Sequence, residues 1–198
     1  MILTLTGASG AGKTTIAREL LNKIPIDSQM VPSYTTRKPR ETDIPGEYKY
    51  VGKFKFQFLN NTGLFLWTAH VHENSYGTTK SWVGKSLQDD GTVYIMILLS
   101  DAIKTLRDFA EKNGVLNSVY SFYISSPSQE VLKKRLEERG DGSEEVQKRL
   151  VNCLKWDRDA LSSGIPYEFV RNDSAVQEAV AEIRSRFLAR FESCDSFF

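Results

Sequence analysis

Residues 7–14 have the composition and spacing of a phosphate-binding loop. They read Gly7-Ala8-Ser9-Gly10-Ala11-Gly12-Lys13-Thr14, which fits the pattern G-x-x-x-x-G-K-[ST] at every fixed position. In such a loop the glycines let the backbone wrap phosphate groups, Lys13 reaches the outer phosphates and Thr14 offers a hydroxyl to Mg²⁺. The pattern therefore predicts a site for a phosphate chain and Mg²⁺. The alternative is a glycine-rich turn that only packs a strand against a helix.

A second cluster lies at residues 33–40, which read Ser33-Tyr34-Thr35-Thr36-Arg37-Lys38-Pro39-Arg40 and are followed by Glu41, Gly46 and Tyr48. Because a proline stands between Arg37 and Arg40, an extended turn rather than an ordinary helix presents their guanidinium groups. Such groups grip a dianionic phosphate with paired hydrogen bonds. The cluster therefore predicts a second phosphate site. A solvated basic loop beside Glu41 and Asp43 is the alternative.

The elements around these loops alternate between strand and helix. An apolar run at 2–6 leads into the first loop, and a helical pattern at 14–21 follows it. A nearly continuous apolar run at 92–99 indicates a strand that is covered on both faces. Beyond it we expect, in order, a helix at 101–113, a strand at 119–124, helices at 128–139 and 144–162, a strand at 167–170 and a last helix from Ser174. This alternation predicts an α/β fold with a parallel sheet flanked by helices.

The length of 198 residues predicts one domain, 1–198, in which 1–31 and 92–198 form the core. Residues 32–91 contain several Pro and Gly between short aromatic and β-branched runs, and we expect them to form an inserted, mostly strand-and-turn subdomain. A net charge of +1 provides no general attraction for nucleic acid or membranes, so neither is an expected partner. The sequence shows no secretory or membrane-spanning pattern, which predicts a cytoplasmic protein.

The two loops and several later motifs together resemble the guanylate kinase family, over almost the whole chain. The later motifs are Tyr76-Gly77-Thr78, Leu132–Gly140 (LKKRLEERG) with Lys148-Arg149-Leu150, and Val170-Arg171-Asn172-Asp173. The resemblance implies a P-loop NTPase-type sheet, a strand-rich acceptor-binding insertion at 32–91 and a short lid at about 140–145. It also implies a monomeric or homodimeric, ATP- and Mg²⁺-dependent nucleoside monophosphate kinase, with GMP or dGMP as the expected acceptor.

The resemblance assigns a role to each matched residue. The implied catalytic residues are Lys13, Arg135, Arg139 and Arg149. The implied ATP-binding residues are Gly7, Ala8, Ser9, Gly10, Ala11, Gly12, Lys13, Thr14, Thr15 and Asn172, with Thr14 at the metal. The implied acceptor-binding residues are Ser33, Arg37, Arg40, Tyr48, Tyr76 and Thr78. Arg135 and Arg139 are also four residues apart, hence on one helical face, although such arginines can simply pair with Glu138, Glu144 or Glu145 on a solvated surface.

The resemblance fails at the residues that read guanine. The family has a Glu before the Y-G-[ST] element, where this chain has Trp67, and an L-D-x-D pattern on the central strand, where it has Ile97 and Leu99. Losing carboxylates that accept from guanine should weaken its selection. Trp67 can stack on a base, but packing in the subdomain core beside Phe65 is the favoured interpretation.

Other polar residues near Trp67 suggest substitutes for the lost carboxylates. Thr68 and His70 precede His72 and Glu73, and these side chains can contact the acceptor or line its pocket; a metal site is a weaker alternative. Asp101 lies two residues beyond Leu99, at a spacing that does not fit a simple replacement.

Three functions are consistent with these motifs. The first is transfer of the ATP γ-phosphoryl group to a nucleoside monophosphate. The second is the same chemistry on ribose 1,5-bisphosphate, since kinases of that type also lack the guanine-reading carboxylates. The third is a non-catalytic module that binds phosphorylated peptides through Arg37, Arg40 and Tyr48. The intact phosphate-binding loop disfavours the third function, and the T-T-R-x-P-R run favours the first over the second.

Overall fold

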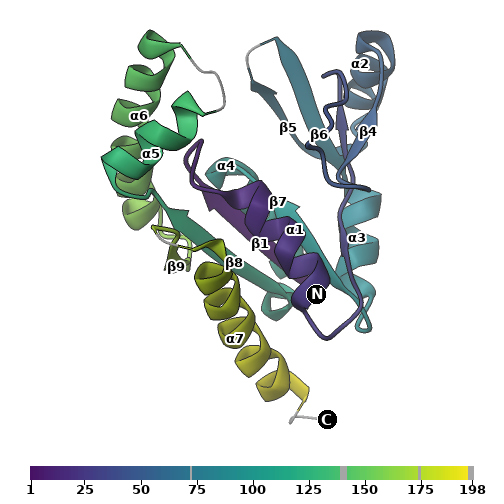
Figure 1. The fold of residues 1–198 in the computed structure, drawn as a ribbon. Coiled ribbons are helices and arrows are strands. Elements are labelled where there is room, and N and C mark those ends of the chain that lie inside the picture. The colour runs from purple at the N-terminus through teal and green to yellow at the C-terminus, as the bar shows by residue number, and fades with distance from the viewer. Residues whose placement is uncertain (72, 139–141, 174, 196–198) are drawn as a thin grey trace. The chain divides into compact units, whose positions relative to one another are not determined.

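The computed structural model describes residues 1–71, 73–138, 142–173 and 175–195 (Figure 1). The chain divides into two compact units. Unit 1 consists of Met1–Thr4 with Pro25–Val119, and unit 2 consists of Leu5–Ile24 with Tyr120–Phe198. Strand β1 (Ile2–Gly7) begins in unit 1 and continues into unit 2.

Unit 1 contains one half of a parallel sheet. Its strands β2 (Ser28–Met30) and β7 (Val93–Ile97) pair in parallel, and the strand order is β2-β7-β1. The buried side chains of β7 confirm the covered strand that the apolar run predicts. Helix α4 (Ser100–Lys112) follows, then a short 3₁₀ turn at Leu116–Ser118. Ile103 and Leu106 are fully buried, as expected from their helical spacing.

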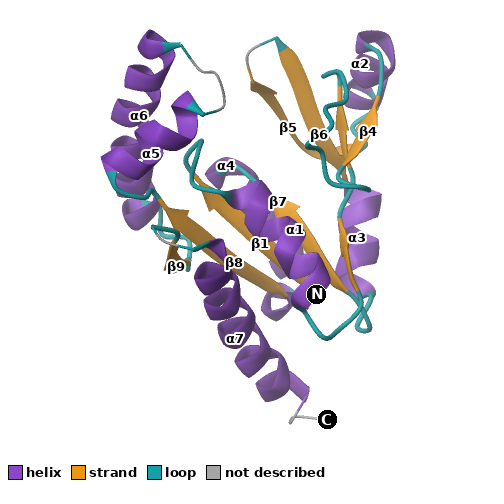
Figure 2. Ribbon diagram, in the orientation of Figure 1, coloured by secondary structure: helices purple, strands orange, loops and turns teal. Residues whose placement is uncertain are grey.

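Unit 1 also contains a second sheet, which the inserted segment forms. The strands are β3 (Ser33–Thr35), β4 (Tyr48–Tyr50), β5 (Phe65–Val71) and β6 (Asn74–Thr79), in the order β4-β3-β6-β5. Helices α2 (Lys53–Asn61) and α3 (Lys80–Gln88) belong to the same segment (Figure 2). The expectation of mostly strands and turns missed both helices. In α2, Phe54, Phe56 and Phe58 alternate with polar residues as in a strand, but only Phe56 is buried.

The residue pairing in this second sheet separates its two faces. Tyr48, Ser33, Thr78 and Trp67 are paired in one row across the four strands, so their side chains share a face. The opposite face carries Phe65, whose ring lies 4.8 Å from that of Phe56 on α2. A register shift between Phe65 and Trp67 places these two near neighbours on opposite faces.

Unit 2 contains parallel strands in the order β1-β8-β9. Strand β8 (Val119–Ser125) pairs in parallel with β9 (Glu168–Arg171). The helices are α1 (Lys13–Lys23), α5 (Gln129–Glu137), α6 (Ser143–Ser162) and α7 (Val176–Asp195). Together with the first unit, this arrangement confirms the predicted α/β fold with a parallel sheet.

The phosphate-binding loop of unit 2 rests on a small apolar core. The members of this core are Ala8, Leu132, Leu136, Val146, Leu150 and Cys153. They come from the loop, α5 and α6, so the core fixes both helices beside the loop. Cys153 is buried there. Among the described residues, no helix is both long enough and apolar enough to span a membrane.

Candidate active site

The phosphate-binding loop joins β1 to α1, as the motif requires. Gly12 is the residue before α1 and has φ 96°, a left-handed conformation that side chains other than glycine rarely adopt. A Cβ at Gly12 would also collide with the amide nitrogen of Asn172. No side chain caps the α1 N-terminus, so its backbone N–H groups remain suited to an anion.

Lys13 folds back over this loop. Its Nζ donates to the carbonyl oxygens of Gly7 and Ala8, both at 2.7 Å. The ammonium group is therefore held at the first two residues of the loop. Thr14 and Thr15 follow in the first turn of α1, and both are exposed.

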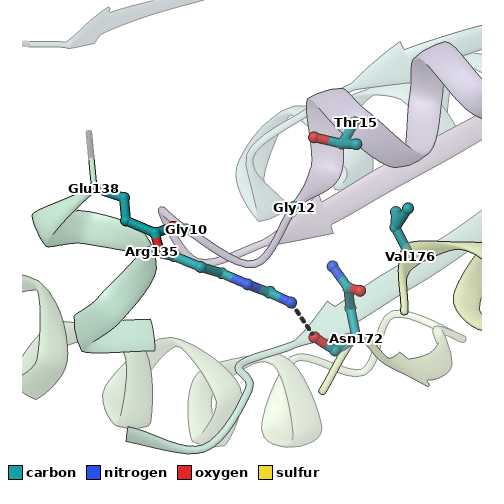
Figure 3. A pocket seen from close by; sticks show the side chains of 7 residues that line it. All are labelled: Gly10, Gly12, Thr15, Arg135, Glu138, Asn172 and Val176. Atoms are coloured by element: carbon teal, nitrogen blue, oxygen red, sulfur yellow. Dashed lines mark hydrogen bonds between the residues drawn. The ribbon is translucent and has the colours of Figure 1, made fainter. Parts of the chain in front are cut away.

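A pocket of about 320 Å³ opens beside the loop (Figure 3). Its lining residues come from the loop, α1, α5 and the segment from β9 to α7: Gly10, Gly12, Thr15, Arg135, Glu138, Asn172 and Val176. The sequence motifs predicted five of these seven as ATP-binding or catalytic. The other two are Glu138, which the sequence suggests only as a surface partner of the arginines, and Val176, which is not among the predicted site residues.

Two polar atoms of this pocket are buried and have no hydrogen-bond partner among the described residues: Arg135 Nη1 and Asn172 Oδ1. Their side chains are otherwise fixed, since Arg135 Nη2 donates to the Asn172 carbonyl at 2.9 Å and Asn172 Nδ2 donates to the Ala11 carbonyl at 2.8 Å. Figure 3 shows both side chains converging beside Gly12. A buried polar atom without a partner costs roughly 1–3 kcal/mol. The pocket therefore offers one donor and one acceptor to a polar ligand.

Arg149 reaches the same loop from α6. Its Nη1 donates to Ser9 Oγ at 3.0 Å, and its Nε lies 2.9 Å from Glu145 Oε1. This pairing was not predicted from the sequence, and together with the contact to Ser9 it holds the Arg149 guanidinium at the loop. Arg139 and residues 140–141 of the predicted lid lie outside the described residues, while Ser143–Glu145 form the first turn of α6.

The predicted acceptor residues of unit 1 gather around Arg37, which is only 8% exposed. Arg37 lies 5.0 Å from the centre of the Tyr48 ring, and the rings of Tyr48 and Tyr76 are 6.1 Å apart. Arg37 Nη2 also donates to Asp43 Oδ1 at 2.7 Å. Arg40 joins the cluster through its backbone, since its N–H donates to Asp43 Oδ2 at 2.7 Å. Arg37 is thus part of an organised cluster, whereas the side chains of Lys38 and Arg40 are exposed.

Electrostatic coupling in this cluster appears in the pKa values. Burial alone would raise the pKa of Asp43, but hydrogen bonds from Arg37 and Tyr50 outweigh it and lower that pKa. The same partnership overcomes the burial of Arg37 and raises its pKa. Glu47 differs, because burial dominates and raises its pKa. Sequence reasoning considered Asp43 only as a neighbour of the basic loop and did not single out Glu47.

Ser33 and Thr78, predicted near the acceptor base, meet in the structure. Their hydroxyl oxygens are 2.7 Å apart, and Thr78 is fully buried. Trp67 shares their face of the second sheet, so its favoured placement in the core beside Phe65 is wrong. Thr68 and His70 alternate with it and lie on the other face, where His70 Nδ1 is 3.2 Å from Ser75 Oγ. His72 lies outside the described residues.

Comparison with known proteins identifies the family. The family model described as "Guanylate kinase" matches residues 1–189. A guanylate kinase of Helicobacter pylori is 38% identical over 156 residues, which are 78% of this chain and 72% of that protein. The guanylate kinase of Caldanaerobacter subterraneus is 32% identical over 195 residues, covering 98% of this chain and 88% of that protein. The chain belongs to the guanylate kinase family.

A solved structure agrees with the fold. The guanylate kinase of Anaplasma phagocytophilum has a TM-score of 0.66 and 23% sequence identity, over 96% of this chain and 85% of that one. Membership of the family confirms the enzyme class predicted from the motifs, an ATP-dependent nucleoside monophosphate kinase. The roles of single residues that the family resemblance implies stay predictions.

Mg²⁺ fits the residues at the loop. Mg²⁺ prefers oxygen ligands, keeps several waters and is held in kinases largely by substrate phosphates. Thr14 presents a hydroxyl beside Lys13 at the exposed N-terminus of α1. Among the described residues, no group of three His, Cys, Asp or Glu side chains forms an alternative cage. Thr14 is therefore the residue that would hold the ion, which when bound neutralises phosphate charge.

Proposed function

We propose that this protein transfers the γ-phosphoryl group of Mg²⁺·ATP to GMP or dGMP. An oxygen of the acceptor phosphate forms the new bond to the γ-phosphorus, the bond to the β,γ-bridging oxygen breaks, and ADP leaves. The acceptor oxygen is already anionic, so positioning and charge neutralisation carry the reaction. The contact of Lys13 with the loop carbonyl oxygens supports a role for its charge at the outer phosphates, and the contact of Arg149 with Ser9 supports a second positive charge there.

The observation that carries the donor half is the pocket beside Gly12. Arg135 Nη1 and Asn172 Oδ1 are buried there without partners in the described chain, so a bound nucleotide that supplies an acceptor and a donor removes both penalties. The acceptor half is supported by Arg37, which is buried against Tyr48 and aligned by Asp43. A guanidinium fixed in this way suits a phosphate dianion.

The test is ADP formation with a panel of acceptors: GMP, dGMP, AMP, UMP and ribose 1,5-bisphosphate. We expect turnover with nucleoside monophosphates, and with GMP and dGMP among them. Lys13→Ala should lower kcat by about 10²-fold or more, because it removes charge from the outer phosphates. Lys23→Ala is the matched control, since Lys23 lies at the far end of the same helix and pairs with Glu19. Turnover of ribose 1,5-bisphosphate alone, or of no acceptor, would overturn the proposal.

A further inference from the structure

Four residues form a continuous row across the second sheet of unit 1. Strand pairing places Tyr48 beside Ser33, Ser33 beside Thr78, and Thr78 beside Trp67. The pairing of Thr35 with Tyr76 puts Thr78 opposite Ser33, two residues along each strand, so both lie on one face. The direct contact between the Ser33 and Thr78 hydroxyl groups confirms this register at the centre of the row.

The row has a phosphate end and an aromatic end. Tyr48 stands at the first, beneath Arg37 and beside Tyr76. Trp67 stands at the second and is partly exposed on the same face. Since neighbouring strands are about 4.8 Å apart, three strand spacings separate the two ends by roughly 14 Å. This span is comparable with the length of a nucleoside monophosphate and its protein contacts.

No member of the row is acidic, and the two carboxylates near its phosphate end are already engaged. Asp43 accepts from Arg37, the Arg40 backbone and Tyr50. Glu47 accepts a hydrogen bond from the backbone N–H of Ile44, and its side chain is also hydrogen-bonded to the Tyr48 side chain. The row therefore presents hydroxyl groups and rings, but not an ionised acceptor, to the base of a nucleotide whose phosphate lies at Arg37.

We infer that Trp67 is the base-recognition residue of this enzyme, and that it selects a purine ring by stacking. The Ser33–Thr78 hydroxyl pair lies beside the stacked ring and can adapt its donor and acceptor roles, because hydroxyl groups rotate. The site therefore accepts purine monophosphates as a class instead of reading the donor set of guanine. The inference rests on the proposed transfer to nucleoside monophosphates and deepens it.

GMP and IMP separate stacking from carboxylate recognition, because they differ only in the exocyclic amino group of guanine. A site that pairs this group with a carboxylate should prefer GMP by tenfold or more. A stacking site loses nothing when the amino group is absent, and we expect kcat/KM for GMP and IMP to agree within about threefold. Replacing a stacked aromatic side chain by alanine costs about 5- to 150-fold in base binding.

The experiment measures kcat and KM for GMP, IMP, AMP and UMP in the wild-type protein and in Trp67→Ala, Trp67→Phe and Trp67→Glu. Trp67→Ala should raise KM for the purines at least fivefold and for UMP less, with kcat changed less than twofold. Trp67→Phe should largely restore the purine KM. Trp67→Glu should raise the GMP/IMP ratio to tenfold or more. Trp82→Phe is the control, since Trp82 lies on α3 beside Lys49 and Lys85.

A wild-type GMP/IMP ratio above tenfold would overturn the inference while leaving the kinase proposal intact. So would an unchanged purine KM in folded Trp67→Ala. If Trp67→Ala does not fold, the inference is still tested by the wild-type GMP/IMP ratio of kcat/KM and by the purine KM of Trp67→Phe. If no monophosphate is phosphorylated at all, the proposed function itself has failed, and that outcome is recognised with the wild-type protein alone.

Discussion

Asp43→Asn tests whether the acceptor cluster is organised by an ion pair. The variant keeps the size of the side chain but removes the negative charge that faces Arg37 at 2.7 Å. Arg37 is 8% exposed and Asp43 is 15% exposed, so solvent screens this pair little. The cation retains the carbonyl of Lys38 at 2.8 Å and the Tyr48 ring.

Removing one partner of a buried ion pair typically costs about 3–5 kcal/mol. Because the Asp43 side chain keeps some contact with water, we expect the free energy of unfolding to fall by about 2–4 kcal/mol at pH 7. The pKa of Asp43 is lowered in the folded state, so its contribution is present above the ordinary value near 4 and is lost as the pH falls below it. The difference between wild type and variant should shrink accordingly.

Urea unfolding at several pH values measures this difference, and an Arg37→Met, Asp43→Asn double-mutant cycle isolates the coupling between the two side chains. We expect a coupling energy of at least about 1 kcal/mol at pH 7. A destabilisation below about 0.5 kcal/mol, or one that is equal at pH 7 and pH 2, would refute the view that this ion pair organises the site.

Three further changes probe the units separately. Glu47→Gln should stabilise the fold at pH 7 and less so as the pH falls towards 4, because burial raises the pKa of Glu47 and penalises its ionised form. Thermal unfolding measures this, and a difference in Tm between variant and wild type that is the same at both pH values would contradict it. Asn172→Ala should weaken ATP binding measured by calorimetry and lower the free energy of unfolding by about 1–3 kcal/mol, since the Ala11 carbonyl loses its donor; wild-type affinity for ATP would count against the pocket. Gly12→Ala should abolish ATP binding through left-handed strain and the clash with Asn172, and unchanged binding would argue against the loop geometry.

The donor half of the site could largely be predicted from the sequence. The phosphate-binding motif has fixed spacing, and the apolar periodicity of the flanking segments places it between a strand and a helix. The resemblance to the family added Arg135, Arg149 and Asn172, all of which the structure brings to this loop. The sequence alone does not show that these distant segments lie together, because their meeting depends on the order of the parallel strands, which the sequence pattern does not give.

The acceptor half was harder to predict, because its outcome depends on register. The sequence favoured packing of Trp67 in the core beside Phe65, but a one-residue irregularity after Phe65 decides which face of the sheet Trp67 occupies. This shift turns Trp67 away from Phe65 and towards Ser33 and Thr78. Helix α2 was missed for a related reason, since its alternating phenylalanines imitate the period of a strand. A cytoplasmic location and the oligomeric state stay predictions from the sequence.

The destination of the γ-phosphoryl group tests the central proposal most directly. The protein is incubated with Mg²⁺, GMP and ATP that carries a radioactive label in the γ-phosphoryl group, and the products are separated by chromatography. The account predicts label in GDP in a one-to-one ratio with the ADP formed, and loss of both products in Lys13→Ala but not in Lys23→Ala. Label released only as inorganic phosphate, or retained in ATP with GMP unchanged, would contradict it.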